Sequence, residues 1–229
     1  MRQITLDMGL GRSASLDNFV AGPNVAVLSH LQLWVGHARS GASLRSPVPT
    51  YLWGATGSGK THLLQAVYAA LQAQGGTVGW LDASMAEAPP FDERWTAIVL
   101  DDVHLYNAVQ QHAAFTWFVQ AQTSQQGVLA AGARVPAQLT LREDLRTRLG
   151  WGHVYELQPL GEAEQRTVLR EAARARGILL SDEIMDFMLT RFSRDLGSLM
   201  QLLDQLDGYA LQTQRAITIP LLKSMLETL

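Results

Sequence analysis

A glycine-rich segment, residues 54–61, has the residue types and spacing that point most directly to chemistry. It follows the short apolar stretch Tyr51–Trp53. Glycines let a backbone wrap so that its N–H groups point at phosphate oxygens, and a helix that begins there adds partial positive charge. We expect Lys60 to reach the β- and γ-phosphates of a nucleotide and the Thr61 hydroxyl to bind Mg²⁺. The expected phosphate contacts are Gly54, Ala55, Thr56, Gly57, Ser58, Gly59, Lys60 and Thr61. A glycine-rich turn that merely precedes a helix is the alternative.

Two adjacent acids, Asp101 and Asp102, follow the apolar run Ala97–Leu100. In a phosphate-binding α/β fold, the end of such a strand carries the carboxylate that holds the magnesium shell. We assign Asp101 to the metal and Asp102 to orienting or polarising an attacking water. A solvated pair of acids at the end of a strand is the alternative.

Two arginines, Arg148 and Arg194, are candidates for the phosphoryl-transfer chemistry. Such sites often import an Arg from a neighbouring molecule, which could be Arg148, whereas Arg194 opens a helix of the C-terminal part and could reach back over the nucleotide. Position alone favours a surface charge for Arg148 and an ordinary helix-start residue for Arg194. Three histidines belong to no cluster of metal-ligand spacing and are expected to be packing or surface residues: His62, His104 and His112. Three tryptophans are expected to anchor the core: Trp95, Trp117 and Trp151.

The elements that position these residues follow from hydrophobic spacing. Strands are expected at 51–53, 77–81, 97–100, 128–131 and 153–157, and helices at 25–37, 60–74 and 113–122. This order predicts an α/β fold with a mostly parallel five-stranded sheet covered by helices on both faces. After Pro159 only helices are expected, at 162–176, 182–192, 196–212 and 220–229, with Gly177, Ser181, Thr218 and Pro220 at their boundaries.

Three regions are predicted: a flexible arm at 1–17, a nucleotide-binding domain at 18–160 and a small helical domain at 161–229. A net charge of −3 argues against general attraction to nucleic acid, so any DNA role is expected to be indirect. Lysine occurs only as Lys60 and Lys223, and there is no cysteine. No apolar run is long enough to cross a bilayer, and we expect a cytoplasmic protein.

Taken together, the phosphate loop, the acid pair, Arg148, Arg194 and the helical C-terminal part resemble the AAA+ ATPases of the DnaA initiator family. The resemblance covers nearly the whole chain, and the helical part then corresponds to the lid domain. More narrowly, the sequence resembles the Hda family of DnaA inactivators. The stretches that carry this narrower resemblance are Phe19–Asn24, Arg148–Leu160, Leu203–Asp207 and Ile217–Pro220.

The resemblance implies roles for several residues. Arg148 matches the arginine finger, and Arg194 matches the second sensor that contacts the nucleotide. Phe19 and Val20 are expected near the adenine, and His62 is counted with the nucleotide-binding residues. The implied cofactors are ADP or ATP with Mg²⁺, and ADP is expected.

The N-terminal arm resembles the motif with which the family binds the sliding clamp of the replicative polymerase. The residues assigned to the clamp are Gln3, Ile4, Thr5, Leu6 and Met8. An extended peptide of this kind offers a glutamine for polar contacts and aliphatic side chains for an apolar pocket. Asp7 and Met8 stand where the family usually shows Pro and Leu. A frayed terminus without a partner is the alternative.

A second departure is Ala133, at a place after the fourth strand where the family commonly has a polar sensor residue. The side chain of Ala133 cannot hydrogen-bond a water or a phosphate, so ATP hydrolysis by the protein itself is expected to be weak or absent. The chain also shows no helix-turn-helix signature for reading DNA sites, which argues against a complete initiator.

The function that the resemblance implies is negative regulation of replication initiation. ADP-bound protein docks on a DNA-loaded clamp and promotes hydrolysis of DnaA-bound ATP through Arg148. The open alternatives are an autonomous AAA+ ATPase or helicase loader, and a non-catalytic adaptor; a nucleotide kinase is less attractive because no acceptor motif is evident. Contact with DNA is expected through the clamp, no membrane partner is expected, and homo-oligomer formation is left open.

Overall fold

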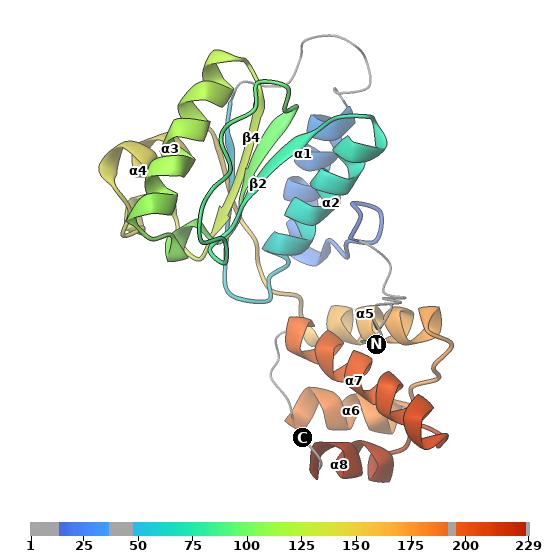
Figure 1. Ribbon diagram of the computed structural model, residues 1–229. Coiled ribbons are helices and arrows are strands. Elements are labelled where there is room, and N and C mark those ends of the chain that lie inside the picture. The colour runs from blue at the N-terminus through green and yellow to red at the C-terminus, as the bar shows by residue number, and fades with distance from the viewer. Residues whose placement is uncertain (1–13, 37–47, 192–195, 228–229) are drawn as a thin grey trace, which may run out of the picture. The chain divides into compact units, whose positions relative to one another are not determined.

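The computed structural model describes residues 14–36, 48–191 and 196–227 (Figure 1). The chain divides into two compact units, one formed by Ala14–Pro159 and the other containing the described residues from Leu160 onward. Each unit has its own hydrophobic core. They are described separately below.

The first unit is built on a five-stranded sheet in the order β2-β3-β4-β1-β5. The strands are β1 (Thr50–Trp53), β2 (Val78–Leu81), β3 (Ala97–Leu100), β4 (Gly127–Gly132) and β5 (His153–Glu156). Every neighbouring pair is parallel, so the predicted α/β fold with a mostly parallel five-stranded sheet is confirmed. The carboxyl ends of β1 and β3, which precede the glycine-rich loop and the acid pair, therefore lie at the same edge of the sheet.

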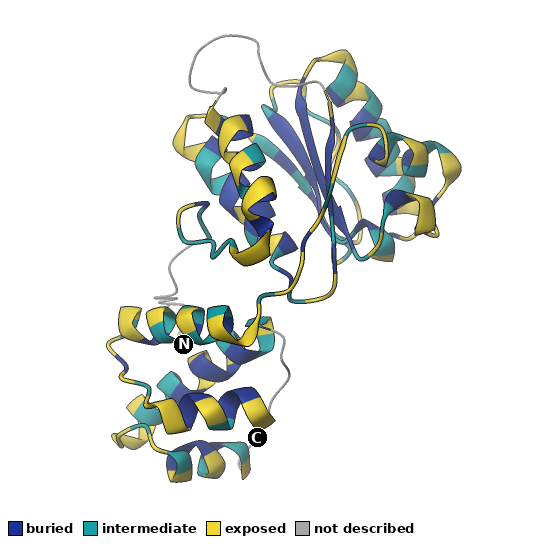
Figure 2. Ribbon diagram, turned by 180° about the vertical axis from the view of Figure 1, so that it is seen from behind, coloured by how far each residue is buried: buried dark blue, intermediate teal, exposed yellow. Residues whose placement is uncertain are grey.

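Helices cover both faces of this sheet (Figure 1). α1 (Val25–Gly36) and α2 (Lys60–Ala73) lie on one face, and α3 (Ala108–Thr123) and α4 (Glu143–Leu149) on the other. β3 shows why: alternate side chains of a strand point to opposite faces, so Ala97 and Val99 join the first core while Ile98 and Leu100 join the second. Figure 2 shows the buried strands between helices whose outer sides are exposed.

The helices α3 and α4 differ from the prediction in two respects. α3 begins at Ala108 rather than near 113, because Asn107 and Gln110 form a capping box that satisfies the first amides of the helix. α4 was not predicted at all. Its first turn carries acids and its last turn carries Arg146 and Arg148, so these charges interact favourably with the helix dipole. The helix is nevertheless too short to show a clear apolar period in the sequence. Short 3-10 turns occur at Gly22–Asn24, Val103–Leu105 and Pro136–Gln138.

The second unit is all helical, with α5 (Glu162–Ala175), α6 (Asp182–Arg191), α7 (Leu196–Thr213) and α8 (Ile219–Glu227). The predicted boundary devices are present. Gly177 has φ +74° after α5, and the Thr218 hydroxyl accepts a hydrogen bond from the Leu221 amide at the start of α8. None of the described helices is long and apolar enough to cross a membrane.

Candidate nucleotide-binding site

The glycine-rich loop connects β1 to α2, and its shape depends on glycine. Gly57 and Gly59 have φ of 77° and 95°, the left-handed region that residues with a side chain rarely adopt. A Cβ at Gly59 would lie 2.8 Å from Phe19 Cε2, and one at Gly54 would lie 2.3 Å from the carbonyl oxygen of Leu157. Gly59 is therefore required both for close approach and for backbone conformation, whereas Gly54 is required for close approach and Gly57 for conformation.

Lys60 is folded into the loop. Only 8% of the residue is exposed, and its Nζ donates to the carbonyl oxygens of Gly54 and Ala55 at 2.9 Å each. Burial lowers the pKa of Lys60, while the nearby Asp102 and Asp101 carboxylates oppose that shift. The ammonium group thus lies at the start of α2, where the N-terminal end of the helix also favours an anion.

Ser58 tests whether the loop fits a phosphate group. The residue is buried, and its Oγ has no hydrogen-bond partner among the described residues. A buried hydroxyl without a partner is costly, so it is expected to have a function. A phosphate oxygen would accept this hydrogen bond, and the loop amides and Lys60 supply the charge. The residues of the loop therefore fit a nucleotide phosphate.

The acid pair lies beside the loop. The Asp101 carboxylate accepts a hydrogen bond from the Thr61 hydroxyl and another, at 2.9 Å, from the amide of Asp102. Burial raises the pKa of Asp101, and the Thr61 hydrogen bond acts against that rise. Asp102 adopts a left-handed conformation, φ 48° and ψ 42°, and its side chain remains 43% exposed. One acid is thus buried and the other is open to solvent.

Thr61 and Asp101 together offer part of a magnesium shell. Within residues 14–36, 48–191 and 196–227, no group of three or more His, Cys, Asp or Glu side chains could hold a metal. Mg²⁺ is commonly bound through one or two carboxylates, waters and the phosphates of a substrate. A hydroxyl and a carboxylate in contact, next to a phosphate loop, match that mode of binding.

A pocket of about 770 Å³ opens beside Thr61, Asp101 and Asp102. Its farther wall includes Tyr68 and Trp80, whose rings meet edge to face at 5.8 Å. This volume lies within the range of small-molecule sites. Tyr68 and Trp80 were not predicted as site residues, because Tyr68 belongs to α2 and Trp80 to β2, and they meet only when the helix packs against the sheet.

Phe19 and His62 also lie near the loop. Phe19 contacts Gly59, its ring centroid is 5.7 Å from that of His62, and His62 Nε2 is 3.0 Å from Asn18 Oδ1. Burial lowers the pKa of His62. The structure thus places Phe19 against the phosphate loop, and the role of Phe19, Val20 and His62 toward an adenine stays a prediction.

Arg148 is in the last turn of α4, on the face of the sheet opposite α2. Its Cζ is 5.4 Å from the ring centroid of Phe115 and 5.6 Å from that of Trp151. It makes no ion pair with any carboxylate in the described part of the chain. Trp151 is 65% exposed, so the prediction that it anchors the core was wrong. Phe115 was missed, although a run of aromatic residues on one helix was visible.

Several predicted site residues lie outside the described residues. These are the clamp-binding residues Gln3, Ile4, Thr5, Leu6 and Met8, and the second-sensor residue Arg194. Ala133, which follows β4, is described and is partly exposed. Its consequence for hydrolysis stays a prediction.

The parallel sheet in the order β2-β3-β4-β1-β5, the phosphate loop after β1 and the acids after β3 define a P-loop protein with the AAA+ fold. Residues 162–226 match the family model of the Hda lid domain, and residues 10–83 match that of the bacterial DnaA ATPase domain. Residues 10–83 are therefore similar to the bacterial DnaA ATPase domain and residues 162–226 to the Hda lid domain, and the first unit has the AAA+ fold.

Solved structures of low sequence identity share the fold. Domain III of the replication initiation protein DnaA from Thermotoga maritima is similar with a TM-score of 0.74 and 19% identity, over 94% of this chain and 96% of that one. AMPPCP-bound DnaA from Aquifex aeolicus has a TM-score of 0.66 and 20% identity, over 86% and 66%. The RuvB Holliday junction branch migration motor of Thermotoga maritima has a TM-score of 0.68 and 19% identity, over 95% and 72%.

Proposed function

We propose that this protein is a negative regulator of replication initiation, which binds adenine nucleotide and promotes hydrolysis of ATP held by DnaA through Arg148 supplied in trans. The observation that carries the proposal is the environment of Arg148. Its guanidinium group is at the rim of the first unit, flanked by aromatic rings and without a carboxylate partner among the described residues. A cation held in this way is available to an anion of another molecule.

The protein's own site holds ADP with Mg²⁺ in this proposal. The loop amides, Ser58 and Lys60 bind the phosphates, and Thr61 with Asp101 holds the metal ion. The proposal is supported by the orphaned Ser58 hydroxyl and by the similar fold of a DnaA that binds AMPPCP. The metal ion offsets phosphate charge when bound. The nucleotide then acts as a ligand that stabilises the fold by mass action, because Ala133 offers no polar group for hydrolysis.

Arg148 acts on the nucleotide of the partner. A guanidinium group is always charged and presents its N–H donors as a planar fork, which suits the oxygens of a transferring phosphoryl group. Charge spreads over those oxygens in the transition state, and an arginine supplied in trans is worth a factor of about 10³–10⁵ in rate. Conversion of DnaA-bound ATP to ADP by this route would suppress re-initiation.

The arm residues Gln3 to Met8 dock on the DNA-loaded sliding clamp in this proposal. Tethering raises the effective concentration of Arg148 near DnaA without any new contact at the ATP site. The net charge of −3 supports an indirect association with DNA through the clamp.

The test is hydrolysis of ATP preloaded on purified DnaA in the presence of clamp-loaded DNA. Wild-type protein is expected to accelerate hydrolysis, Arg148→Ala to lose the effect, and a variant lacking residues 1–10 to lose most of it. Arg142→Ala is the matched control, because Arg142 lies on the same ring of Phe115 but is paired with Asp144. No acceleration by the wild-type protein would refute the proposal.

A non-catalytic adaptor is a second candidate, favoured by Ala133. In that case the nucleotide is purely structural, and recognition by the arm and the lid suppresses initiation. Arg148→Ala would then retain full activity in a replication-initiation assay. Retained activity of this variant, with normal nucleotide binding, would favour the adaptor.

A further inference from the structure

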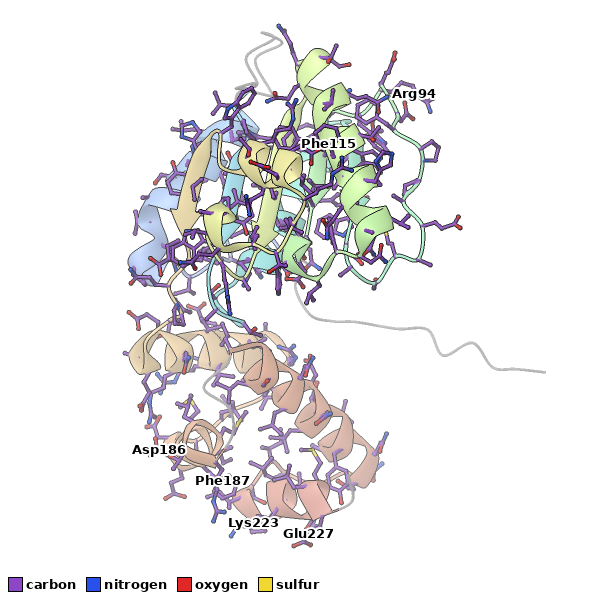
Figure 3. All side chains as sticks on the ribbon, turned by 90° about the vertical axis from the view of Figure 1, so that its left-hand side faces the viewer. Arg94, Phe115, Asp186, Phe187, Lys223 and Glu227 are labelled. Carbon is purple, nitrogen blue, oxygen red and sulfur yellow. The ribbon has the colours of Figure 1, made fainter. Side chains whose placement is uncertain are left out.

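Two guanidinium groups approach the same aromatic ring. Phe115 projects from α3 toward α4 (Figure 3), and the Cζ atoms of Arg142 and Arg148 lie 5.0 Å and 5.4 Å from its ring centroid. Both distances are within the reach of cation–π attraction. The two arginines come from opposite ends of α4, so one ring contacts both ends of this short helix.

The two arginines differ in their other partners. Arg142 is neutralised by Asp144: Nε and Nη2 donate to the two carboxylate oxygens at 2.7 Å and 2.6 Å. Within the described parts of the chain, Arg148 has no such carboxylate, and it has ring faces instead. Besides Phe115, its Cζ is 5.6 Å from the Trp151 ring and 6.0 Å from that of the buried Phe118. Arg142 is thus a paired surface charge, whereas Arg148 keeps its N–H donors for another acceptor.

The backbone around Trp151 is fixed on both sides. The Trp151 amide donates to the Arg148 carbonyl oxygen at 3.1 Å, which caps the last turn of α4. A Cβ at Gly152 would lie only 2.0 Å from the Pro49 carbonyl oxygen, and the His153 amide donates to the same oxygen at 2.9 Å. The indole is nevertheless 65% exposed. A solvent-exposed tryptophan on a fixed backbone and against an arginine is unlike a core residue and requires another explanation.

We propose that Phe115 and Trp151 are positioning residues, whose ring faces hold the Arg148 guanidinium in the orientation in which it meets the partner's nucleotide. This inference rests on the proposed function of Arg148. A long side chain loses rotamer freedom when it is held in one geometry, and preorganisation removes that cost from the catalytic step. Ring faces suit this task because they restrain the cation without using its N–H donors, which a carboxylate would occupy.

The first test measures the geometry without any partner. In the ¹H–¹⁵N spectrum of arginine side chains, the Nε–Hε signal of Arg148 is the one that disappears in Arg148→Lys. Aromatic ring currents should shift this signal, and Trp151→Leu or Phe115→Leu should each move it toward the position of a solvated arginine. Trp151→Phe and Phe115→Tyr keep a ring face and should preserve much of the shift. A signal that none of these changes moves would overturn the inference, whatever the hydrolysis assay shows.

The second test uses stimulated hydrolysis of DnaA-bound ATP. Trp151→Leu and Phe115→Leu should each lower the maximal rate about three- to tenfold, the range of one cation–π contact, with little change in half-saturating concentration. Trp151→Phe should recover much of the loss. In an Arg148→Ala background, Trp151→Leu should add nothing, because the tryptophan acts through the arginine. Arg142→Ala should change the rate little, and thermal unfolding checks that each variant is folded.

The outcomes separate the inference from the function on which it rests. A ring-current shift lost in the leucine variants, with no stimulation by the wild-type protein, refutes the proposed function and leaves the positioning of Arg148 standing. An altered half-saturating concentration, with an equal loss in the Arg148→Ala background, would show that Trp151 contacts the partner directly and would overturn the positioning role.

Discussion

The phosphate loop around Lys60 and the surface around Arg148 place a positive charge in opposite environments. Lys60 is buried and donates to carbonyl oxygens of its own loop. Arg148 is partly exposed and contacts rings without a carboxylate partner in the described residues. In the first arrangement, the Lys60 ammonium group is hydrogen-bonded within its own loop until an anion enters. In the second, no carboxylate of the described residues pairs with the guanidinium, which suits an anion that belongs to another molecule.

In the proposed function the two regions have different roles. The phosphate loop binds a ligand that stabilises the fold, whereas Arg148 acts on the nucleotide of a partner. If both statements are correct, the two regions can be inactivated separately. Lys60→Ala and Arg148→Ala test this separation directly, and smaller effects are expected for Ser58→Ala and His30→Gln.

Lys60→Ala should weaken binding of ADP and Mg²⁺ about 10- to 100-fold, because it removes charge-assisted hydrogen bonds to phosphate. Titration calorimetry measures this, with Lys223→Ala, the chain's other lysine, as the control that should bind normally. Arg148→Ala should leave the affinity for ADP and Mg²⁺ unchanged and lower stimulated hydrolysis about a thousandfold. If Arg148→Ala weakens the protein's own nucleotide binding as much as Lys60→Ala does, the two regions are not separate.

Ser58→Ala should weaken nucleotide binding about two- to tenfold while the ligand-free protein keeps or slightly gains stability. The reason is that the buried Ser58 hydroxyl finds no partner until a phosphate enters, so its removal costs only the bound state. Chemical denaturation without nucleotide and calorimetry with nucleotide give the two quantities. A destabilised ligand-free variant would show that the hydroxyl is satisfied within the loop.

The smallest expected effect is on the pH dependence of stability. It concerns the surroundings of strand β5, which leads to Leu157, whose carbonyl oxygen lies beside Gly54. Burial, and then the neighbouring His153, lower the pKa of His30, whose ring also contacts Tyr155. The unfolded chain therefore binds this proton more readily, so stability falls as pH drops below about 6.5, the ordinary histidine pKa. His30→Gln should reduce that fall in denaturant titrations at several pH values. An unchanged slope would contradict the assignment to His30.

The lid shows the limit of the same approach. Residues 162–226 match the Hda lid domain, and its helices are described in residues 162–191 and 196–227, but Arg194 lies outside the described residues. The role of Arg194 toward a nucleotide therefore stays a prediction, and so does the role of the clamp-binding residues Gln3 to Met8.

The sequence by itself determined the parts of the site that depend on local spacing. The glycine-rich loop, Lys60, Thr61 and the acids after Ala97–Leu100 are consecutive in the chain, and β–α alternation requires their strands to be parallel and to end at one edge. Helix boundaries at Gly177 and Thr218 were likewise predictable, because caps act within a few residues.

Only the tertiary structure decided what surrounds Arg148. Phe115 belongs to α3, whereas Arg148 lies in α4, and α4 is too short for its apolar period to be recognised in the sequence. Trp151 looked like a core residue because tryptophan is highly buried on average, whereas the structure leaves it 65% exposed. The burial of the unpartnered Ser58 hydroxyl and the pocket beside Thr61 are likewise properties of packing, because both exist only once the loop and the helices are packed on the sheet.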